Sequence, residues 1–381
     1  MNDRNRKTDT NEIDSRKQPL WYSGRYFDYP LFGIVLGLVL FGLVMVYSTS
    51  SYRADELYGD STYFAKRQLV FELVALVGMF LVSKIDYRRY ARYSKYFLYV
   101  AIALLVLVYI IGSASHGSTR WIYIGAFGFQ PSEFAKLTLI VYTADICTRK
   151  PRSLNTIKGL AKMLLLPLIT IVLIAIENLS TAIICFGIVM IIVFVASPKN
   201  WHFILMGVLG ILMCVVFIAT AGYRADRIRI WLAPEKYDDG YQTMQSLYAI
   251  GSGGFFGRGL GNSIQKMGFI PESHNDMIFS VICEELGLFG AVLTIIMFIL
   301  LIYRCTVLAI NSGDRFGGLI AVGVMAHIAV QVLINISVVT NTIPPTGVPL
   351  PFISYGGSSI FFLLLEMGLM FAVARQIKPG R

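Results

Sequence analysis

Residues 31–48 read LFGIVLGLVLFGLVMVYS, an uncharged apolar run close to the length that a helix needs to cross a bilayer. Similar runs recur along the 381-residue chain, whose composition is 56% hydrophobic. Soluble domains are about half apolar and do not concentrate their apolar residues in this way. The sequence therefore predicts an all-α polytopic membrane protein.

The apolar runs define ten predicted spans in a single membrane domain, residues 31–381. Their approximate ranges are 31–48, 68–83, 95–112, 133–147, 161–176, 179–197, 201–222, 277–303, 317–339 and 356–376. Residues 1–30 are polar and lack the apolar core of a secretory signal. They are predicted to form a disordered cytoplasmic tail before an uncleaved first span.

Basic residues gather in the predicted loops 84–95 and 148–162, which hold five Lys or Arg each. Because positive charge favours the cytoplasmic side, these loops and both termini are predicted to be cytoplasmic. This distribution explains the net charge of +10 without a nucleic-acid partner. The five cysteines form no C-x-x-C pair, which argues against a zinc site and a disulfide framework.

The same topology places three long loops outside: 49–67, 113–132 and 223–276. The third lies between the seventh and eighth spans and is the largest. Its basic and acidic residues are balanced, and it contains several aromatic residues. Loops of this length are usually functional, so we expect a folded loop on the membrane surface.

The densest polar cluster is Pro271-Glu272-Ser273-His274-Asn275-Asp276, directly before the eighth span. A carboxylate at that position lies between water and apolar walls. Desolvation would raise its pKa, whereas a helix N-terminus or a cation would lower it. The alternative is that Asp276 only caps the helix that begins near Met277, since aspartate is a favoured N-cap residue.

The loop 113–132 contains Ser118-Thr119-Arg120-Trp121 and leads into Gln130-Pro131-Ser132-Glu133-Phe134-Ala135-Lys136. Glu133 and Lys136 are three residues apart and therefore share a helix face. Charges at membrane depth usually line a cavity or find a partner. Two interpretations stay open: contact with a substrate, or a mutual ion pair that stabilises the bundle.

Two further segments are irregular. Residues 346–359, TGVPLPFISYGGSS, cannot form a regular lipid-facing helix and must be buried in protein or line a wet cavity. Residues 251–259, GSGGFFGRG, lack the spacing of a phosphate loop and are predicted to be a flexible or re-entrant hinge. Glu284, Glu285 and Glu366 could serve a proton path or interhelical hydrogen bonds.

Together these segments resemble the FtsW/RodA/SpoVE family of proteins of cell shape, elongation, division and sporulation. The resemblance rests on Ser118–Trp121, Gln130–Lys136, Tyr241-Gln242 with Gln245-Ser246, Pro271–Asp276 with Glu284–Gly287, and Gly347–Ser359. Three segments are more similar in sequence to FtsW and SpoVE than to RodA: Pro271–Asp276, Cys283–Glu285 and Val338–Thr342.

The chain departs from the family pattern at two places. Glu177-Asn178-Leu179-Ser180 stands where the family often has Pro-Asp-Leu-Gly, which puts a role for that motif's carboxylate in doubt. Asn275 replaces the threonine of the usual His-Thr-Asp, and the aspartate is retained as Asp276.

The resemblance implies a ten-span fold and a peptidoglycan glycosyltransferase that acts on lipid II at the outer face of the bacterial cytoplasmic membrane. It also implies a class B penicillin-binding protein transpeptidase as partner, with other division or elongation proteins. Asp276 matches the family's essential aspartate. Other recurring motif positions, which we predict to bind substrate, are Arg120, Lys136, Gln245, Ser246, His274, Ser354, Tyr355 and Gly356.

The leading hypothesis is an inverting lipid II polymerase of septal wall synthesis, with Asp276 as general base. Arg120 and Lys136 are candidates for binding the pyrophosphate, and a divalent cation, Mg²⁺ or Mn²⁺, is a candidate cofactor whose ligands the sequence does not identify. No organic cofactor is expected.

Three alternatives remain: a lipid II flippase, an elongation-type (RodA-like) polymerase, and a scaffold that only positions the transpeptidase. A flippase predicts essential charges at mid-membrane, whereas the enzyme predicts an essential acid at the outer surface. The predicted external position of Asp276 favours the enzyme.

Overall fold

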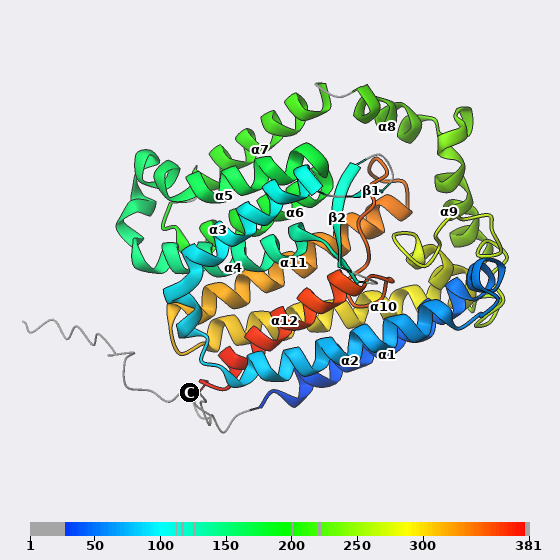
Figure 1. Cartoon of the computed structure of the whole chain (residues 1–381), viewed down its shortest axis with the longest axis horizontal. Coiled ribbons are helices and arrows are strands. Elements are labelled where there is room, and N and C mark those ends of the chain that lie inside the picture. The colour runs from blue at the N-terminus through cyan, green and yellow to red at the C-terminus, as the bar shows by residue number, and fades with distance from the viewer. Residues whose placement is uncertain are drawn as a thin grey trace, which may run out of the picture.

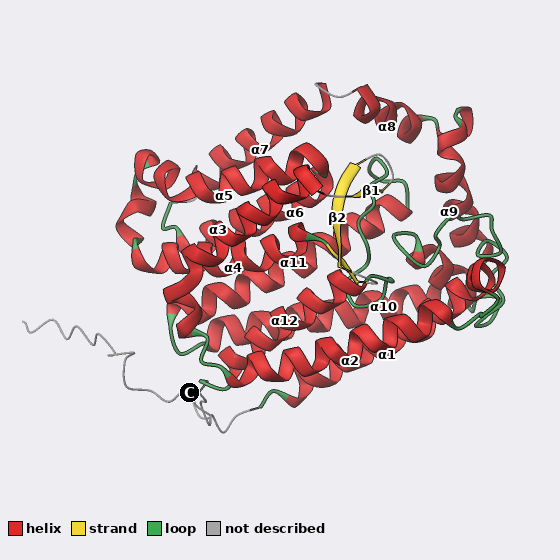
Figure 2. Cartoon of the chain, viewed as in Figure 1, coloured by secondary structure: helices red, strands yellow, loops and turns green. Residues whose placement is uncertain are grey.

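A computed structural model describes residues 27–377 apart from 112, 116–117, 125–126, 200 and 220–221. Within these residues the chain is a bundle of α-helices with one small sheet (Figures 1 and 2). The helices are α1 (Tyr29–Tyr58), α2 (Tyr63–Lys84), α3 (Arg88–Ile111), α4 (Pro131–Arg149), α5 (Ile157–Glu177), α6 (Leu179–Ala196), α7 (Trp201–Ala219), α8 (Gly222–Leu232), α9 (Tyr241–Ser252), α10 (Ile278–Asn311), α11 (Arg315–Val339) and α12 (Gly357–Ala374).

Each predicted span corresponds to one long helix, α1–α7 or α10–α12. In the described part of the chain, seven helices are long and apolar enough to cross a membrane: α1, α3, α5, α6, α10, α11 and α12. α7 contains a shorter apolar stretch, Phe203–Val216. α2 and α4 carry charged side chains within their length, such as Glu72 and Lys136. The prediction of an all-helical polytopic membrane protein is confirmed.

Side chains of Asp, Thr and Asn begin several of these helices. Asp28 accepts a hydrogen bond from the Leu31 amide at the start of α1, and Asp314 accepts one from Gly317 at the start of α11. Asn178 is the single residue between α5 and α6, and its side chain accepts from the Thr181 amide. Such caps satisfy amides that the first helical turn leaves without a partner.

The loop predicted at residues 49–67 is wrong in its bounds, because the actual loop between α1 and α2 is much shorter. α1 continues to Tyr58, where Gly59 ends it in the left-handed conformation, and α2 begins at Tyr63. Likewise, most of the predicted loop 84–95 belongs to α3. Polar residues mark where a helix leaves the apolar part of the bilayer, but they do not end the helix. Of the predicted tail, residues 1–30, positions 1–26 lie outside the described residues. The helix α1 already begins at Tyr29.

A small antiparallel sheet, which the sequence did not suggest, forms in the loop between α3 and α4. It consists of β1 (Ser113–Ser115), β2 (Ser118–Ile124) and β3 (Phe127–Phe129), in the order β1-β2-β3. Ile122 pairs with Phe129, and Tyr123 pairs with Gly128. The central strand β2 carries Arg120 and Trp121 of the predicted motif.

The two described ends of the chain meet at one end of the bundle. The rings of Phe27 and Phe371 stack with their centroids 5.1 Å apart. At the same end, Asp314 accepts hydrogen bonds from Tyr87 and Arg88 across 2.7 Å each. The sheet and α9 lie towards the opposite end (Figure 1). Both described ends at one end of the bundle agree with an even number of crossings.

The bundle exposes apolar side chains on its outside and buries polar side chains within a largely apolar core. On α2, Leu73, Val74 and Val77 are 51–60% exposed, whereas Gln68 and Glu72 are buried. Such a surface would be an aggregation hazard in water but suits contact with lipid. Buried ionisable groups in a membrane bundle are costly and therefore point to function or to paired networks.

The glycine-rich segment 251–259 is held against a break in α10. Gly287 interrupts this helix with φ 66° and ψ −162°. There the Arg258 and Gly259 amides donate to the carbonyls of Glu284 and Glu285 over 3.0 and 2.9 Å, and the Leu288 amide donates to Gly254. These hydrogen bonds hold the segment in place, which argues against a flexible hinge; its re-entrance into the membrane stays a prediction.

We predict that Gly287→Ala destabilises the external loop. The backbone conformation of Gly287 costs other residues about 1–3 kcal/mol, and a Cβ there would lie 2.6 Å from the Phe255 carbonyl oxygen. A lower thermal unfolding temperature in detergent should result. Gly251→Ala is the matched control, because its Cβ would meet nothing within 4 Å. Equal unfolding temperatures for the two variants would contradict the prediction.

Candidate functional site

Asp276 lies in the turn that leads into α10 and is half-buried. Its carbonyl oxygen accepts a hydrogen bond of 2.7 Å from the Asn335 side chain of α11. The N-cap of α10 is Met277, whose side chain makes no capping hydrogen bond. Asp276 therefore precedes the N-cap position by one residue.

His274 is 5% exposed and packs between two aromatic rings. Its centroid lies 4.7 Å from that of Phe64 and 5.4 Å from that of Tyr355. Desolvation lowers the pKa of His274 to about 4, so the imidazole is neutral at pH 7. Its Nδ1 is buried without a hydrogen-bond partner.

The irregular segment 340–356 packs beside this turn. The Tyr355 amide donates to the His274 carbonyl over 2.9 Å, and the Gly356 amide donates to Gln68 of α2. Ser354 is buried, and its hydroxyl accepts from the Leu350 amide over 2.8 Å. The non-helical prediction is confirmed, with several of these residues buried in protein.

A row of polar side chains on α11, which the sequence reasoning missed, supports this segment. His327, Gln331 and Asn335 are spaced by four and therefore share a helix face. Gln331 donates to the Pro349 carbonyl, and Asn335 donates to that of Val348. The signal was present in the sequence: three polar residues at helical spacing in an otherwise apolar span.

Lys136 of α4 lies in a buried network and is 2% exposed. Its Nζ lies 2.9 Å from Glu133 Oε1 and 3.2 Å from Gln331 Oε1. Gln331 in turn contacts His327, whose other ring nitrogen lies 2.7 Å from Glu366 of α12. The predicted ion pair between Glu133 and Lys136 is confirmed.

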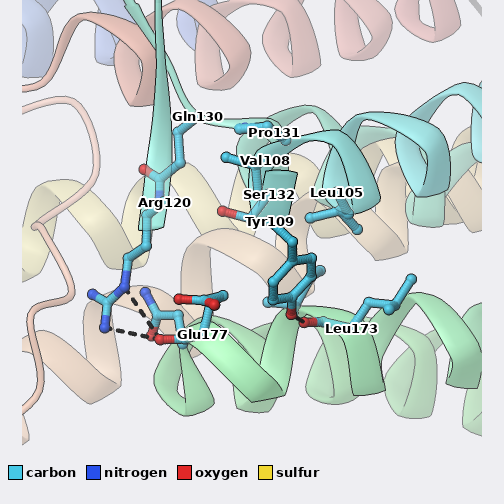
Figure 3. Close-up of a pocket in the computed structure, with 11 residues that line it drawn as sticks. Leu105, Val108, Tyr109, Arg120, Gln130, Pro131, Ser132, Leu173 and Glu177 are labelled. Carbon is cyan, nitrogen blue, oxygen red and sulfur yellow. Dashed lines mark hydrogen bonds between the residues drawn. The ribbon is translucent and has the colours of Figure 1, made fainter. Parts of the chain in front are cut away.

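Arg120 points towards the C-terminal end of α5 (Figure 3). Its Nε and Nη2 donate to the Glu177 carbonyl over 3.2 and 3.0 Å (Figure 3). It lines a pocket with residues of α3, α4 and α5, such as Tyr109 and Ser132, and with Asn178, which joins α5 to α6. Asp276 is not among the residues that line this pocket. Glu177 and Asn178, which belong to the motif that departs from the family pattern, thus lie beside Arg120.

Gln245 and Ser246 lie on α9. The buried Ser246 hydroxyl donates to the Val339 carbonyl over 3.0 Å and so attaches α9 to the end of α11. Gln245 is half-buried. Of the predicted site residues, the structure gathers His274, Ser354, Tyr355 and Gly356 beside Asp276 and leaves Arg120 in a separate pocket.

Glu284 and Glu285, which the sequence left between two roles, hold the external loop. Glu285 contacts Ser48 of α1 and forms a 2.7 Å ion pair with Lys266. Glu284 accepts from the Ser263 hydroxyl and from the Ile264 amide. Glu285 makes the predicted interhelical hydrogen bond, accepted from Ser48 of α1, whereas the partners of Glu284 lie in the external loop.

The family assignment follows from comparison with known proteins. A model of the family described as cell cycle protein, FtsW/RodA/SpoVE, matches residues 29–379. The chain belongs to the FtsW/RodA/SpoVE family.

Three similar proteins illustrate this family's range. Stage V sporulation protein E of Bacillus subtilis is 39% identical over 348 residues, which are 90% of this chain and 95% of that protein. The probable peptidoglycan glycosyltransferase FtsW of Trichlorobacter lovleyi is 37% identical over 358 residues, or 92% and 94%. A chain of a peptidoglycan synthase complex, whose structure concerns coordination of polymerization and crosslinking, superposes with a TM-score of 0.78, 27% identity and coverage of 93% and 99%.

The described side chains of this FtsW/RodA/SpoVE protein do not form a metal site by themselves. In the part of the chain that the structure covers, no three or more His, Cys, Asp or Glu side chains gather to hold a metal ion. Mg²⁺ is often held by one or two carboxylates together with substrate phosphates. The divalent cation stays a prediction, and no step proposed below passes through it.

Proposed function

We propose that this chain is a membrane-embedded peptidoglycan glycosyltransferase. It polymerises lipid II with inversion of configuration at the anomeric carbon. The observation that carries the proposal is the position of Asp276, half-buried in the turn before α10 and joined to the irregular segment 340–356 through Asn335, which donates to the carbonyls of both Asp276 and Val348. Similarity to a probable peptidoglycan glycosyltransferase over nearly the whole chain supports it.

In the proposed reaction, the sugar 4-hydroxyl of one lipid-linked chain attacks the anomeric carbon of another. Asp276 accepts the hydroxyl proton as the new glycosidic C–O bond forms. The anomeric C–O bond to phosphate breaks, and the pyrophosphate leaves with the electron pair. We assign the positive charge for the developing pyrophosphate to Arg120 and Lys136. In this structure Arg120 is held by the Glu177 carbonyl and Lys136 by Glu133, so each must give up that contact to bind phosphate.

The assay for this proposal is purified protein with labelled lipid II, followed by separation of the glycan products. Glycan chains made by the wild type support a polymerase. A flippase instead moves lipid II across a vesicle membrane and makes no glycan, which would contradict the proposal.

We further propose a septal role together with a class B penicillin-binding protein. One similar structure is of a complex that couples polymerization and crosslinking, which supports such a partner. Depletion from dividing cells should produce filaments without septa. Normal division with defective spores would instead indicate a sporulation role, and rounded cells an elongation role.

We also propose that both termini are cytoplasmic and that α8 and α9 lie outside. In a cysteine-free background, a membrane-impermeant thiol reagent should label Asp238→Cys but not Arg92→Cys in intact cells. Both positions are exposed in the fold, so accessibility to water does not separate them. Permeabilised cells, in which both should react, are the control. Labelling of Arg92→Cys from outside would reverse the orientation.

A further inference from the structure

Five rings form a continuous aromatic stack beside Asp276. Tyr58 at the end of α1 stacks on Tyr63 of α2 with centroids 3.9 Å apart and planes at 14°. Tyr63 and Tyr58 both contact Phe64, over 5.3 and 5.8 Å. Phe64 then contacts His274 and Tyr355. The stack therefore connects the surface to the turn that carries Asp276.

Exposure falls along this stack. Tyr58 is 53% exposed, Tyr63 and Phe64 are half-buried, and His274 is 5% exposed. At the buried end, Nδ1 of His274 has no hydrogen-bond partner. A buried polar atom without a partner costs free energy unless a ligand or water satisfies it. This atom therefore marks a place where a polar ligand group would be favourable.

The chemistry of the stack matches a sugar. Aromatic rings have an electron-rich face, which attracts the C–H groups on the apolar face of a pyranose. Phenol hydroxyls and an imidazole nitrogen provide polar contacts at the ring edges for sugar hydroxyls and amides.

We propose that Tyr58, Tyr63, Phe64 and His274 form a binding subsite for the N-acetylhexosamine residues of the lipid-linked glycan that the enzyme extends. This inference rests on the proposed function. The occupant is a sugar because the stack is continuous with the candidate catalytic turn. A belt of tyrosines that only contacts the membrane interface is the competing explanation.

The test uses the full-length protein in detergent and the variant Tyr58→Leu. Chitotetraose, a β-1,4-linked N-acetylglucosamine tetrasaccharide, serves as the probe in saturation-transfer NMR. An aromatic contact is worth about 0.5–1.5 kcal/mol, so Tyr58→Leu should weaken binding by about 2- to 10-fold. In polymerisation, we expect a similar rise in KM for lipid II and shorter glycan chains. Tyr58→Phe, which keeps the ring, should retain most of the saturation transfer.

Tyr47→Leu is the matched control, because Tyr47 lies on α1 with similar exposure, 47%, and outside the stack. Equal tetrasaccharide binding by the wild type, Tyr58→Leu and Tyr47→Leu would overturn the subsite and favour the membrane belt. Binding that depends on Tyr58 in a protein that makes no glycan would refute the proposed polymerase but keep the sugar site.

Discussion

Asp276→Asn should lower the rate of lipid II polymerisation by about 10²–10⁴, the contribution typical of a general base. Asparagine has almost the same shape, but its amide does not accept the proton of the attacking hydroxyl. Because Met277, and not Asp276, occupies the N-cap position of α10, and because asparagine caps helices as well as aspartate does, the substitution should leave the unfolding temperature close to that of the wild type. The rate is measured as glycan formed per enzyme, and stability as thermal unfolding in detergent.

Glu272→Gln is the control for this experiment. Glu272 lies in the same turn, is exposed, and accepts a hydrogen bond from Asn275 that glutamine can also accept. It should therefore polymerise at nearly the wild-type rate. If Asp276→Asn were as active as Glu272→Gln, Asp276 would not be the base.

The spans could be predicted from the sequence because a bilayer demands long apolar helices and little else satisfies the backbone in lipid. The ends of the spans could not. α1 passes position 48 by a further ten residues to Tyr58, since a polar helix projecting into water keeps its hydrogen bonds. The sheet around Arg120 also escaped prediction, because strands of three to seven residues leave too short a pattern to read.

At the candidate site, the sequence identified the segments but not their contacts. Asp276, His274 and Tyr355 belong to motifs read from the chain, yet their proximity depends on how segment 340–356 folds back onto the turn before α10. The spacing of Gln331 and Asn335 in an apolar span marked a shared polar face, but not the carbonyl groups of Pro349 and Val348 to which they donate. Contacts between distant segments are not encoded in local spacing.

The second large effect is expected at the buried ion pair of α4. Lys136→Met would leave the Glu133 carboxylate buried without its cation, which typically costs about 3–5 kcal/mol. Gln331 Oε1 would keep its contact with His327, 2.9 Å away. The loss of stability therefore comes mainly from the unpaired Glu133 carboxylate. A strong loss of folded protein is expected in size-exclusion chromatography and thermal unfolding. Arg88→Met, which breaks a more exposed pair with Asp314, should cost about 1 kcal/mol or less.

The double variant Glu133→Gln/Lys136→Met separates a structural role of Lys136 from a catalytic one. It removes both charges together, and replacing a buried ion pair by neutral side chains is often close to neutral for stability. The double variant should therefore regain most of the unfolding temperature lost in Lys136→Met. If Lys136 also stabilises the departing pyrophosphate, polymerisation should remain about 10²–10³ below the wild type, the usual cost of losing one electrostatic contact to developing charge. Recovery of both stability and polymerisation in the double variant would instead assign Lys136 to the packing of α4 against α11, and Arg120 would remain the candidate cation for the pyrophosphate.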